Sequence, residues 1–344
     1  LASSFSDQEY KDAGASIAGD AAAALKDADV ILKVQRPLTD AEGGPDELSL
    51  MKKGSTLISV LAPTQNRDQV QAYADAGIEA HAMELVPRIS RAQSMDVLSS
   101  QSNLAGYKAV LDAGAVYGKG MPMMMTAAGT IAPAKAFIMG VGVAGLQAIA
   151  TARRLGAIVT ATDVRAATKE QVESLGAKFI MVESEETGEG EGGYAKEMSD
   201  DYKKKQAELV FEHVKKQDIV ITTALIPGRD APILISDEML AVMKPGSVIV
   251  DLAVEAGGNV TQSKPGEIVE TDNGVLIVGH RNVPSRLASD ASSLYAKNLL
   301  NFLQPMINKE TGSLEMDWED EIIQGTGLTR DGKVVHPLLT EGGN

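Results

Sequence analysis

The stretch AFIMGVGVAGLQAIATARRLGAIVTATD, residues 136–163, constrains most strongly what this chain can fold into. An apolar run ends at Gly140, and the pattern Gly140-x-Gly142-x-x-Gly145 then opens a helix of small residues. In such a pattern the first glycine permits a tight turn, the second lets a pyrophosphate approach the backbone, and the third lets helix and strand pack closely. A second apolar run ends at Asp163. The segment therefore predicts a strand-helix-strand unit that binds a dinucleotide.

Asp163 indicates which dinucleotide this unit prefers. A carboxylate at the end of the second strand can accept hydrogen bonds from the adenosine ribose, and it repels a 2′-phosphate, so it favours NAD over NADP. Arg165 complicates this inference, although its position also suits exposure to solvent or stacking on adenine. The free N–H groups at the start of the helix after Gly142 would face the phosphates.

Apolar runs alternate with helical patterns along most of the chain. The strand candidates are 30–34, 55–61 and 78–83, and then 136–140, 157–163, 178–182, 218–224, 246–253 and 274–279. Such alternation predicts parallel sheets with crossover helices. We therefore expect an α/β fold of two Rossmann-like, doubly wound parallel-sheet domains. The expected domains are residues 1–125 together with 290–344, and residues 126–289.

Ligands of doubly wound sheets lie beyond the carboxyl ends of the strands, which nominates 222–228 and 250–258 as further walls of the site. Ala224 and Leu225 would cover the adenosine or the nicotinamide side, whereas Asp251 and Glu255 would bind the cofactor or cap a turn. Segment 183–205, rich in glutamate and glycine, is expected to be a mobile surface loop, either a solvated insertion or a functional lid.

Charge and cysteine content exclude several classes of protein. The formal net charge of −15 argues against a nucleic-acid partner, because phosphate binding depends on clustered Lys and Arg. The absence of cysteine excludes disulfides and thiolate metal sites and favours a reducing compartment, and we predict no metal site. No apolar run reaches the roughly 18 residues of a transmembrane helix, and no signal peptide opens the chain. Because the sequence starts at Leu1, we expect that an N-terminal piece has been removed or left out.

A dehydrogenase that oxidises an alcohol or amine needs a base, usually histidine or lysine. His81 lies inside a strand pattern and is expected to be structural, and His213 lies on a charged helix and is expected to be solvated. His280 closes the last strand and is the serious candidate, whereas His336 lies in the tail.

The segment PRISRAQSMDVLSSQSNLAGY, residues 87–107, offers many hydrogen-bonding groups but no histidine, cysteine, lysine or glutamate. Its polar side chains include Arg88, Ser90, Arg91, Gln93, Ser94, Asp96, Ser99 and Ser100. Such a segment can position a ligand but contains none of these four nucleophiles and bases.

Five long segments carry a resemblance to a known family: 83–107, 123–157, 162–179, 221–235 and 251–259. They resemble the NAD(H)-binding domain I of the alpha subunit of proton-translocating NAD(P) transhydrogenases, and the similarity runs from about residue 10 to residue 340. Alanine dehydrogenases are relatives of this family and share its two-domain plan.

The resemblance implies roles for individual residues. The loop beside the nicotinamide would be Arg88, Ile89, Ser90, Gln93, Ser94, Met95 and Asp96, with Arg88, Gln93, Asp96 and Ser99 acting at the reacting ring. The pyrophosphate contacts would be Val143, Ala144 and Gly145, and the ribose contacts Asp163, Val164 and Arg165. The mobile loop and the site it covers would include Gly193, Tyr194, Gln206 and Leu225.

The resemblance also implies a reaction that suits these groups. Hydride would pass directly from NADH to NADP bound on a partner domain, coupled to proton movement across a membrane. Because carbon gives hydride to carbon, the step exchanges no proton, and the site must supply orientation instead. The implied protein is a homodimer on the cytoplasmic face of the inner membrane, peripheral to a complex that also holds an NADP-binding domain and a membrane-spanning proton-channel domain.

Two alternatives stay open. In an alanine dehydrogenase Lys33 would match a substrate-binding lysine, although Ala62 and Pro63 stand in the stretch that carries the catalytic histidine of those enzymes, and Glu255 replaces their aspartate. Lys33, Gln35 and Arg36 end a strand and could face the cleft, or the two cations could belong to an ordinary strand-end charge pair. The second alternative is an NAD-binding module without catalysis, because this chain contains one predicted nucleotide site.

Three further expectations concern packing. A connecting helix would carry Leu104, Tyr107, Val110 and Leu111 on one apolar face, and an apolar helix at 292–307 would return to the first domain. Met121 and Met123 to Met125 are expected to pack as core at the interdomain hinge, with a contact surface for a partner as the alternative.

Overall fold

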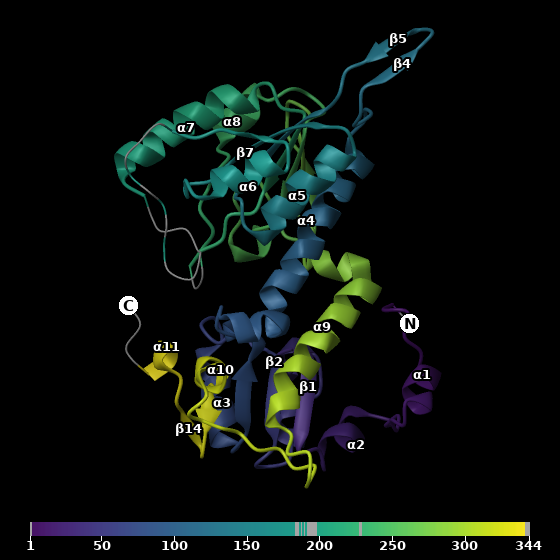
Figure 1. The fold of residues 1–344 in the computed structure, drawn as a ribbon, viewed down its shortest axis with the longest axis vertical. Helices are drawn as coiled ribbons and strands as arrows, with labels where there is room; N and C mark the ends of the chain where they lie inside the picture. Colours follow the sequence, from purple (N-terminus) through teal and green to yellow (C-terminus); the bar gives the residue numbers. More distant parts are fainter. Residues whose placement is uncertain are drawn as a thin grey trace. The chain divides into compact units, whose positions relative to one another are not determined.

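The computed structural model describes residues 2–182, 186, 188, 190, 198–226 and 229–340 (Figure 1). The chain forms two compact units: unit 1 is Leu1–Gln101 with Ala288–Asn344, and unit 2 is Ser102–Leu287. The divisions predicted from the sequence lie near residues 125 and 290. The first division lies inside α4 (Val97–Val116), because Ala109, Val110 and Ala113 of this helix belong to the core of unit 2.

Unit 2 is built on a seven-stranded sheet in the order β11-β12-β10-β9-β6-β7-β8. The strands are β6 (Lys135–Met139), β7 (Ile158–Thr162), β8 (Lys178–Phe179), β9 (Ile219–Thr222), β10 (Val248–Asp251), β11 (Ile268–Glu270) and β12 (Leu276–Val278). Neighbouring strands are parallel, except that β11 runs antiparallel to β12. The predicted α/β class, with a sheet of doubly wound order, is confirmed.

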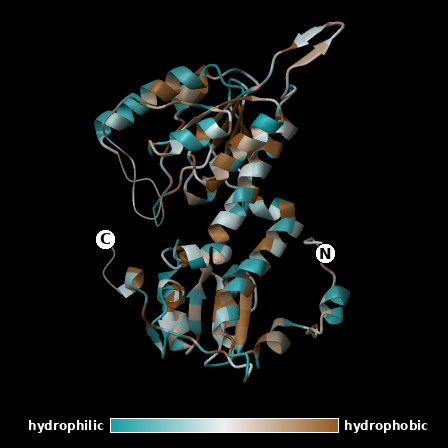
Figure 2. Ribbon diagram, in the orientation of Figure 1, coloured by the Kyte–Doolittle hydropathy of each residue, from teal (hydrophilic) through white to brown (hydrophobic). Residues whose placement is uncertain are grey.

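Helices cover both faces of this sheet, because successive strand residues point to opposite sides. On one face, α4, α5 (Val143–Arg154) and α6 (Thr168–Ser174) enclose a core that contains Ile138. On the other face, α7 (Asp200–Val214) and α8 (Asp237–Val242) enclose a core that contains Phe137. Figure 2 shows hydrophobic residues along the strands inside each unit.

Unit 1 is built on a three-stranded parallel sheet, β1 (Val30–Gln35), β2 (Thr56–Val60) and β3 (Glu79–Ala82), in that order. The helix α9 (Ala288–Leu303) packs on it through Tyr295, Leu299 and Phe302, which confirms the expected return of the apolar helix. The other α-helices and strands described in unit 1 are α1 (Asp7–Asp12), α2 (Ala21–Leu25), α3 (Arg67–Asp75), α10 (Glu321–Thr326), α11 (Pro337–Thr340), β13 (Thr329–Arg330) and β14 (Lys333–Val334).

The methionine-rich segment forms a hairpin rather than core. Its strands, β4 (Met124–Thr126) and β5 (Gly129–Ile131), pair with each other alone, and the hairpin projects from the body of unit 2 (Figure 1). Met121 is buried as expected, but Met123, Met124 and Met125 are 60%, 38% and 77% exposed. The core prediction was wrong for these three residues, because a two-stranded ribbon has no second layer in which to bury its side chains.

The buried face of α4 also differs from the prediction. Val110 is buried, but Tyr107 is exposed, and Leu104 and Leu111 are half-buried. Besides Val110, the buried face contains the small residues Ala105, Gly106, Ala109 and Ala113. No described helix is long and apolar enough to cross a membrane.

Candidate functional site

The glycine loop after β6 has the geometry that its sequence predicts. Gly140 has φ +98°, which favours glycine, and a Cβ there would lie 2.5 Å from Thr223 Oγ1. A Cβ on Gly145 would lie 2.9 Å from the carbonyl carbon of Gly140, so only glycine allows α5 to start this close to β6. At Gly142, the N-cap of α5, a Cβ would meet no described atom within 4 Å. A pyrophosphate could therefore approach the backbone at Gly142, beside the N–H groups at the start of α5.

The helix α4 packs against the first turn of α5, which follows this loop. A Cβ on Gly106 would lie 2.8 Å from the carbonyl carbon of Ala144, so the backbones of α4 and of the first turn of α5 are in direct contact. Sequence reasoning missed Gly106. The small residues 105, 106, 109 and 113 recur at helical spacing and could have indicated a close helix contact.

The Asp163 carboxylate ties the loop to the end of β7. Its Oδ2 accepts the N–H of Val141 at 2.7 Å, and its Oδ1 accepts the N–H of Arg165 at 2.9 Å. The Arg165 guanidinium donates to both oxygens, at 2.8 and 2.7 Å, instead of lying in solvent. Val164 is half-buried and packs against a cluster of Val182, Met198 and Tyr202. The ribose contact expected of Asp163 stays a prediction.

The second wall of the site lies where β9 and β10 end. Ala224 is half-buried and Leu225 exposed. The Asp251 carboxylate is fully buried and accepts N–H groups of Ala253 and Asn259, so it caps the turn after β10. Burial raises the pKa of Asp251, although these hydrogen bonds partly oppose the effect. Glu255 accepts the N–H of Asn282 at 2.7 Å.

The polar loop predicted beside the nicotinamide belongs to unit 1. It forms a 3-10 helix, Ser90–Met95, followed by α4. Asp96 and Ser99 come together, because Asp96 accepts the Ser99 hydroxyl at 2.6 Å and its N–H at 2.9 Å. The other predicted residues divide by exposure: Arg88, Ser90, Gln93 and Ser94 are exposed, Ile89 is half-buried, and Met95 is buried in the core.

Not every predicted residue can be located. Gly193 and Tyr194 lie outside the described residues, as does much of the expected loop 183–205. Gln206 is half-buried on α7. The glycine loop, Asp163 and Ala224 share unit 2, whereas the polar loop is part of unit 1.

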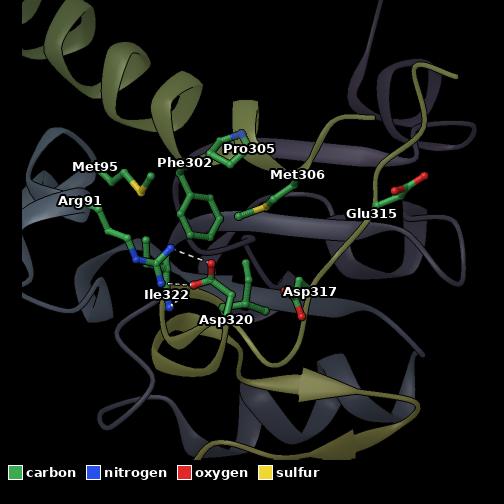
Figure 3. Close-up of a pocket in the computed structure, with 10 residues that line it drawn as sticks. Arg91, Met95, Phe302, Pro305, Met306, Glu315, Asp317, Asp320 and Ile322 are labelled. Atoms are coloured by element: carbon green, nitrogen blue, oxygen red, sulfur yellow. Dashed lines mark hydrogen bonds and ion pairs between the residues drawn. The ribbon is translucent and has the colours of Figure 1, made fainter. Parts of the chain in front are cut away.

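Arg91, also in the polar loop, serves the structure of unit 1. Its guanidinium donates to both carboxylate oxygens of Asp320, at 2.7 and 2.6 Å, on the wall of a small cavity (Figure 3). The cavity is lined by Arg91, Met95, Phe302, Pro305, Met306, Glu315, Asp317, Asp320, Ile322 and Ile323. Of the predicted cofactor contacts it includes Met95 alone, so it is a different feature from the candidate site.

Two histidines of unit 1 have structural surroundings. His81 is fully buried, with its ring near Phe302 and Trp318 and its Nδ1 3.2 Å from the hydroxyl of Thr326, as expected of a structural histidine. His336 is buried, and its Nε2 lies 3.1 Å from the carbonyl oxygen of Gly325.

The two histidines of unit 2 differ from each other. The prediction that His213 is solvated was wrong: its ring packs edge-on against Phe137, its Nε2 lies 2.8 Å from the Thr160 hydroxyl, and burial lowers its pKa. His280, which follows β12, is half-buried. Its pKa is lowered mainly by burial and secondly by the positive charge of Arg286.

The cations at the end of β1 are paired within unit 1. Lys33 Nζ donates to both oxygens of Glu47 at 2.7 Å, and Arg36 forms an ion pair with Glu42. The nearby Glu84 carboxylate accepts the N–H of Leu61 at 2.9 Å and that of Ala62. Lys33, Arg36 and the backbone N–H groups of Leu61 and Ala62 therefore all donate to carboxylates of the chain itself. Among the residues with described positions, no group of three His, Asp or Glu side chains could hold a metal ion.

The glycine loop, the acid after β7 and the strand order define a dinucleotide-binding Rossmann unit joined to a second α/β unit. Residues 1–105 match the family described as alanine dehydrogenase/PNT, N-terminal domain, and residues 109–337 match its C-terminal domain. The chain belongs to this family of NAD(H)-binding oxidoreductases.

Individual relatives of the chain carry two kinds of name. The first part of the NAD(P) transhydrogenase alpha subunit of Rhodospirillum rubrum is 61% identical over 342 residues, 99% of this chain and 88% of that protein. The protein of the same name from Rickettsia prowazekii is 49% identical, over 99% of this chain and 87% of that protein. An alanine dehydrogenase of Methanococcus maripaludis is 30% identical, over 99% of this chain and 85% of that protein.

Solved structures show the same two likenesses. The transhydrogenase from Sinorhizobium meliloti is 56% identical and superposes with a TM-score of 0.85, over 97% of this chain and 88% of that one. An L-alanine dehydrogenase at 24% identity, with a TM-score of 0.79 over 98% of this chain and 87% of that one, shows the shared fold.

Proposed function

We propose that this chain is the NAD(H)-binding component of a proton-translocating transhydrogenase. The observation that carries the proposal is the glycine loop of unit 2, with Asp163 bound to its Val141 N–H, in a chain 61% identical to a transhydrogenase alpha subunit. The open space at Gly142 and the start of α5 fit a pyrophosphate. When bound, NADH supplies the hydride that its C4 gives to NADP⁺ on a partner domain.

The residues of the polar loop would orient the reacting ring. Arg88 and Gln93 are exposed and can donate hydrogen bonds to a carboxamide, and the Asp96–Ser99 hydrogen bond fixes two further polar groups at the start of α4. Direct transfer between two carbons requires near contact, about 3–3.5 Å, and no base. The structural surroundings of His81, His213 and His336 are consistent with such a reaction.

Alanine dehydrogenase is the less favoured interpretation. Lys33, which would bind its substrate, is paired with Glu47, and Ala62 stands in the stretch that carries the catalytic histidine of those enzymes. The identity to the M. maripaludis alanine dehydrogenase is half that to the R. rubrum transhydrogenase subunit. These observations favour hydride transfer between nucleotides over oxidation of an amino acid.

We infer the same assembly that the resemblance implied. The chain would form a homodimer, bind an NADP-binding domain, and lie at the cytoplasmic side of the inner membrane beside a membrane-spanning proton-channel domain. The segment of the β4–β5 hairpin supports a contact of this kind, because Met123 and Met125 expose large apolar side chains on a chain of net charge −15.

Isotope transfer tests the proposed reaction. The full chain is mixed with an NADP-binding partner domain, NADP⁺ and NADH deuterated at the transferred C4 position. We expect the label in NADPH, because hydride passes directly between the rings. Label released to water, or reduction of NAD⁺ by alanine in place of transfer to NADP⁺, would contradict the proposal. NADH binding without any transfer would identify a non-catalytic NAD-binding module.

Two arginines of the polar loop give a matched pair for this assay. Arg88→Ala should lower the transfer rate at least tenfold, because it removes a group that orients the ring. Arg91→Ala should leave the rate within twofold, since Arg91 is engaged with Asp320 at the surface. Equal rates for both variants would remove Arg88 from the mechanism.

A further inference from the structure

The amide of Asn259 holds the backbone of Ala224 by two hydrogen bonds. Asn259 is fully buried, and its Oδ1 accepts the Ala224 N–H at 3.1 Å. Its Nδ2 donates to the carbonyl oxygens of Ala224 at 2.9 Å and Pro232 at 2.8 Å. Both donor hydrogens of the amide are therefore used, and the peptide groups on either side of Ala224 are fixed in one orientation.

The position of Asn259 is itself fixed by Asp251. The buried Asp251 Oδ2 accepts the Asn259 N–H at 2.9 Å, and its Oδ1 accepts the hydroxyl of Thr222 at 3.2 Å. The turn between them needs glycine: Gly258 has φ +85°, and a Cβ there would lie 2.9 Å from Asp251 Oδ2. The segment VDLAVEAGGN thus brings the end of β10 back to the end of β9.

The sheet order indicates which part of a dinucleotide this contact serves. In a doubly wound sheet each half binds one mononucleotide, and the two halves meet where the strand order reverses, here between β6 and β9. The acid Asp163 follows β7, so the adenosine half lies on that side. Ala224 follows β9, on the other side, and its N–H lies 3.3 Å from the position of a Cβ on Gly140.

We propose that Asn259 is a positioning residue that fixes the Ala224 edge of the site for the nicotinamide half of NAD(H). The inference rests on the proposed function, because it requires a dinucleotide in unit 2. Without the amide, Ala224 loses a partner for both its N–H and its carbonyl, and the chain that continues to Leu225 is free to adopt other conformations. The nicotinamide half then loses a preorganised wall, whereas the adenosine half keeps Asp163 and the glycine loop.

Two ligands separate this role from general support of the fold. NADH contains both halves, and ADP-ribose lacks the nicotinamide. We expect Asn259→Ala in the full chain to weaken NADH binding about tenfold and to leave ADP-ribose binding within twofold of the wild type. Asn259→Ser shortens the side chain but keeps a hydroxyl that can donate one hydrogen bond, so it should show the same selectivity with a smaller loss, and it serves if the alanine variant does not fold.

Asn273 provides a matched control. Its Nδ2 also donates to two carbonyl oxygens, of Leu240 at 3.0 Å and Met243 at 3.3 Å, at the amino end of the same sheet. Asn273→Ala should lower the melting temperature comparably and leave binding of both ligands within twofold. Equal weakening of NADH and ADP-ribose by the Asn259 variants, or selective NADH loss in Asn273→Ala, would overturn the inference and leave the proposed function standing. Failure of the wild-type chain to bind NADH would refute the proposed function and this inference with it.

Discussion

Gly106→Ala tests whether α4 sets the position of the glycine loop. The added Cβ would lie 2.8 Å from the carbonyl carbon of Ala144 and 3.0 Å from its Cα. Carbon atoms pack at about 3.5–4.0 Å, so α4 and the first turn of α5 must separate by roughly 1 Å. That turn carries the N–H groups proposed to face the pyrophosphate.

Two opposing effects set the magnitude for Gly106→Ala. Overpacking of a tight contact costs about 1–3 kcal/mol, whereas alanine in place of glycine inside a helix gains about 1 kcal/mol. We therefore expect the free energy of unfolding to fall by about 0–2 kcal/mol. Since a displacement near 1 Å misplaces several hydrogen-bond donors together, NADH binding should weaken at least tenfold, or by about 1.4 kcal/mol.

Gly114 supplies the control within the same helix. A Cβ on Gly114 would meet one described atom within 4 Å, the flexible end of Met121 at 3.3 Å. Gly114→Ala should thus raise the free energy of unfolding by up to about 1 kcal/mol and leave NADH binding unchanged. Urea unfolding measures the stability of both variants, and fluorescence titration measures their affinity for NADH. If Gly106→Ala is stabilised like Gly114→Ala and binds NADH as the wild type does, the reasoning about α4 is refuted.

Three further predictions concern buried polar groups. Asp112→Ala removes the acceptor of Arg286, which is 39% exposed, and should lower the free energy of unfolding by about 2 kcal/mol. Burial opposes ionisation of Asp112, but the hydrogen bonds from Arg286 and Lys108 outweigh this effect and lower the pKa of Asp112. The stability that the wild type gains over Asp112→Ala should therefore be complete above pH about 3.9, and it should disappear as pH falls through the lower pKa of the folded state. Urea unfolding of both proteins from pH 7 to pH 3 checks this. Tyr73→Phe should be neutral or stabilising by up to about 1 kcal/mol in urea unfolding, because the buried Tyr73 hydroxyl has no hydrogen-bond partner among the described residues; a larger loss would reveal one. Asp163→Asn should raise NADPH affinity relative to NADH, since it removes the charge that repels a 2′-phosphate; an unchanged ratio in fluorescence titration would count against that role.

The sequence predicted the parts of the site that depend on local backbone geometry. The positive φ of Gly140 and the close approach at Gly145 follow from a motif of six residues, and the alternation of strands and helices was enough to predict the α/β class. His81 could be assigned a structural role from its place in a strand pattern. In each case the deciding neighbours are close in sequence, or the strand period determines which face is buried.

Other features depend on partners that are distant in sequence. The contact of Asn259 with Ala224 spans 35 residues, and the contact of His213 with Thr160 spans 53, so a charged helix pattern could not show that His213 is half-buried. The exposed Met125 resembles a core residue because hydropathy alone does not indicate whether a hairpin has a second layer. The sequence places Arg165 two residues after Asp163, but it does not show that the two side chains form an ion pair.

The hydrogen bond from Val141 to Asp163 has a consequence for redesign of nucleotide preference. The same carboxylate that would read the ribose also anchors the glycine loop to β7. A small or basic residue introduced at position 163 to accept a 2′-phosphate would leave the Val141 N–H without its acceptor. The glycine loop would then be held less firmly, and binding of any nucleotide would weaken. Conversion to the phosphorylated coenzyme would therefore need a compensating acceptor for that amide, supplied by a second substitution.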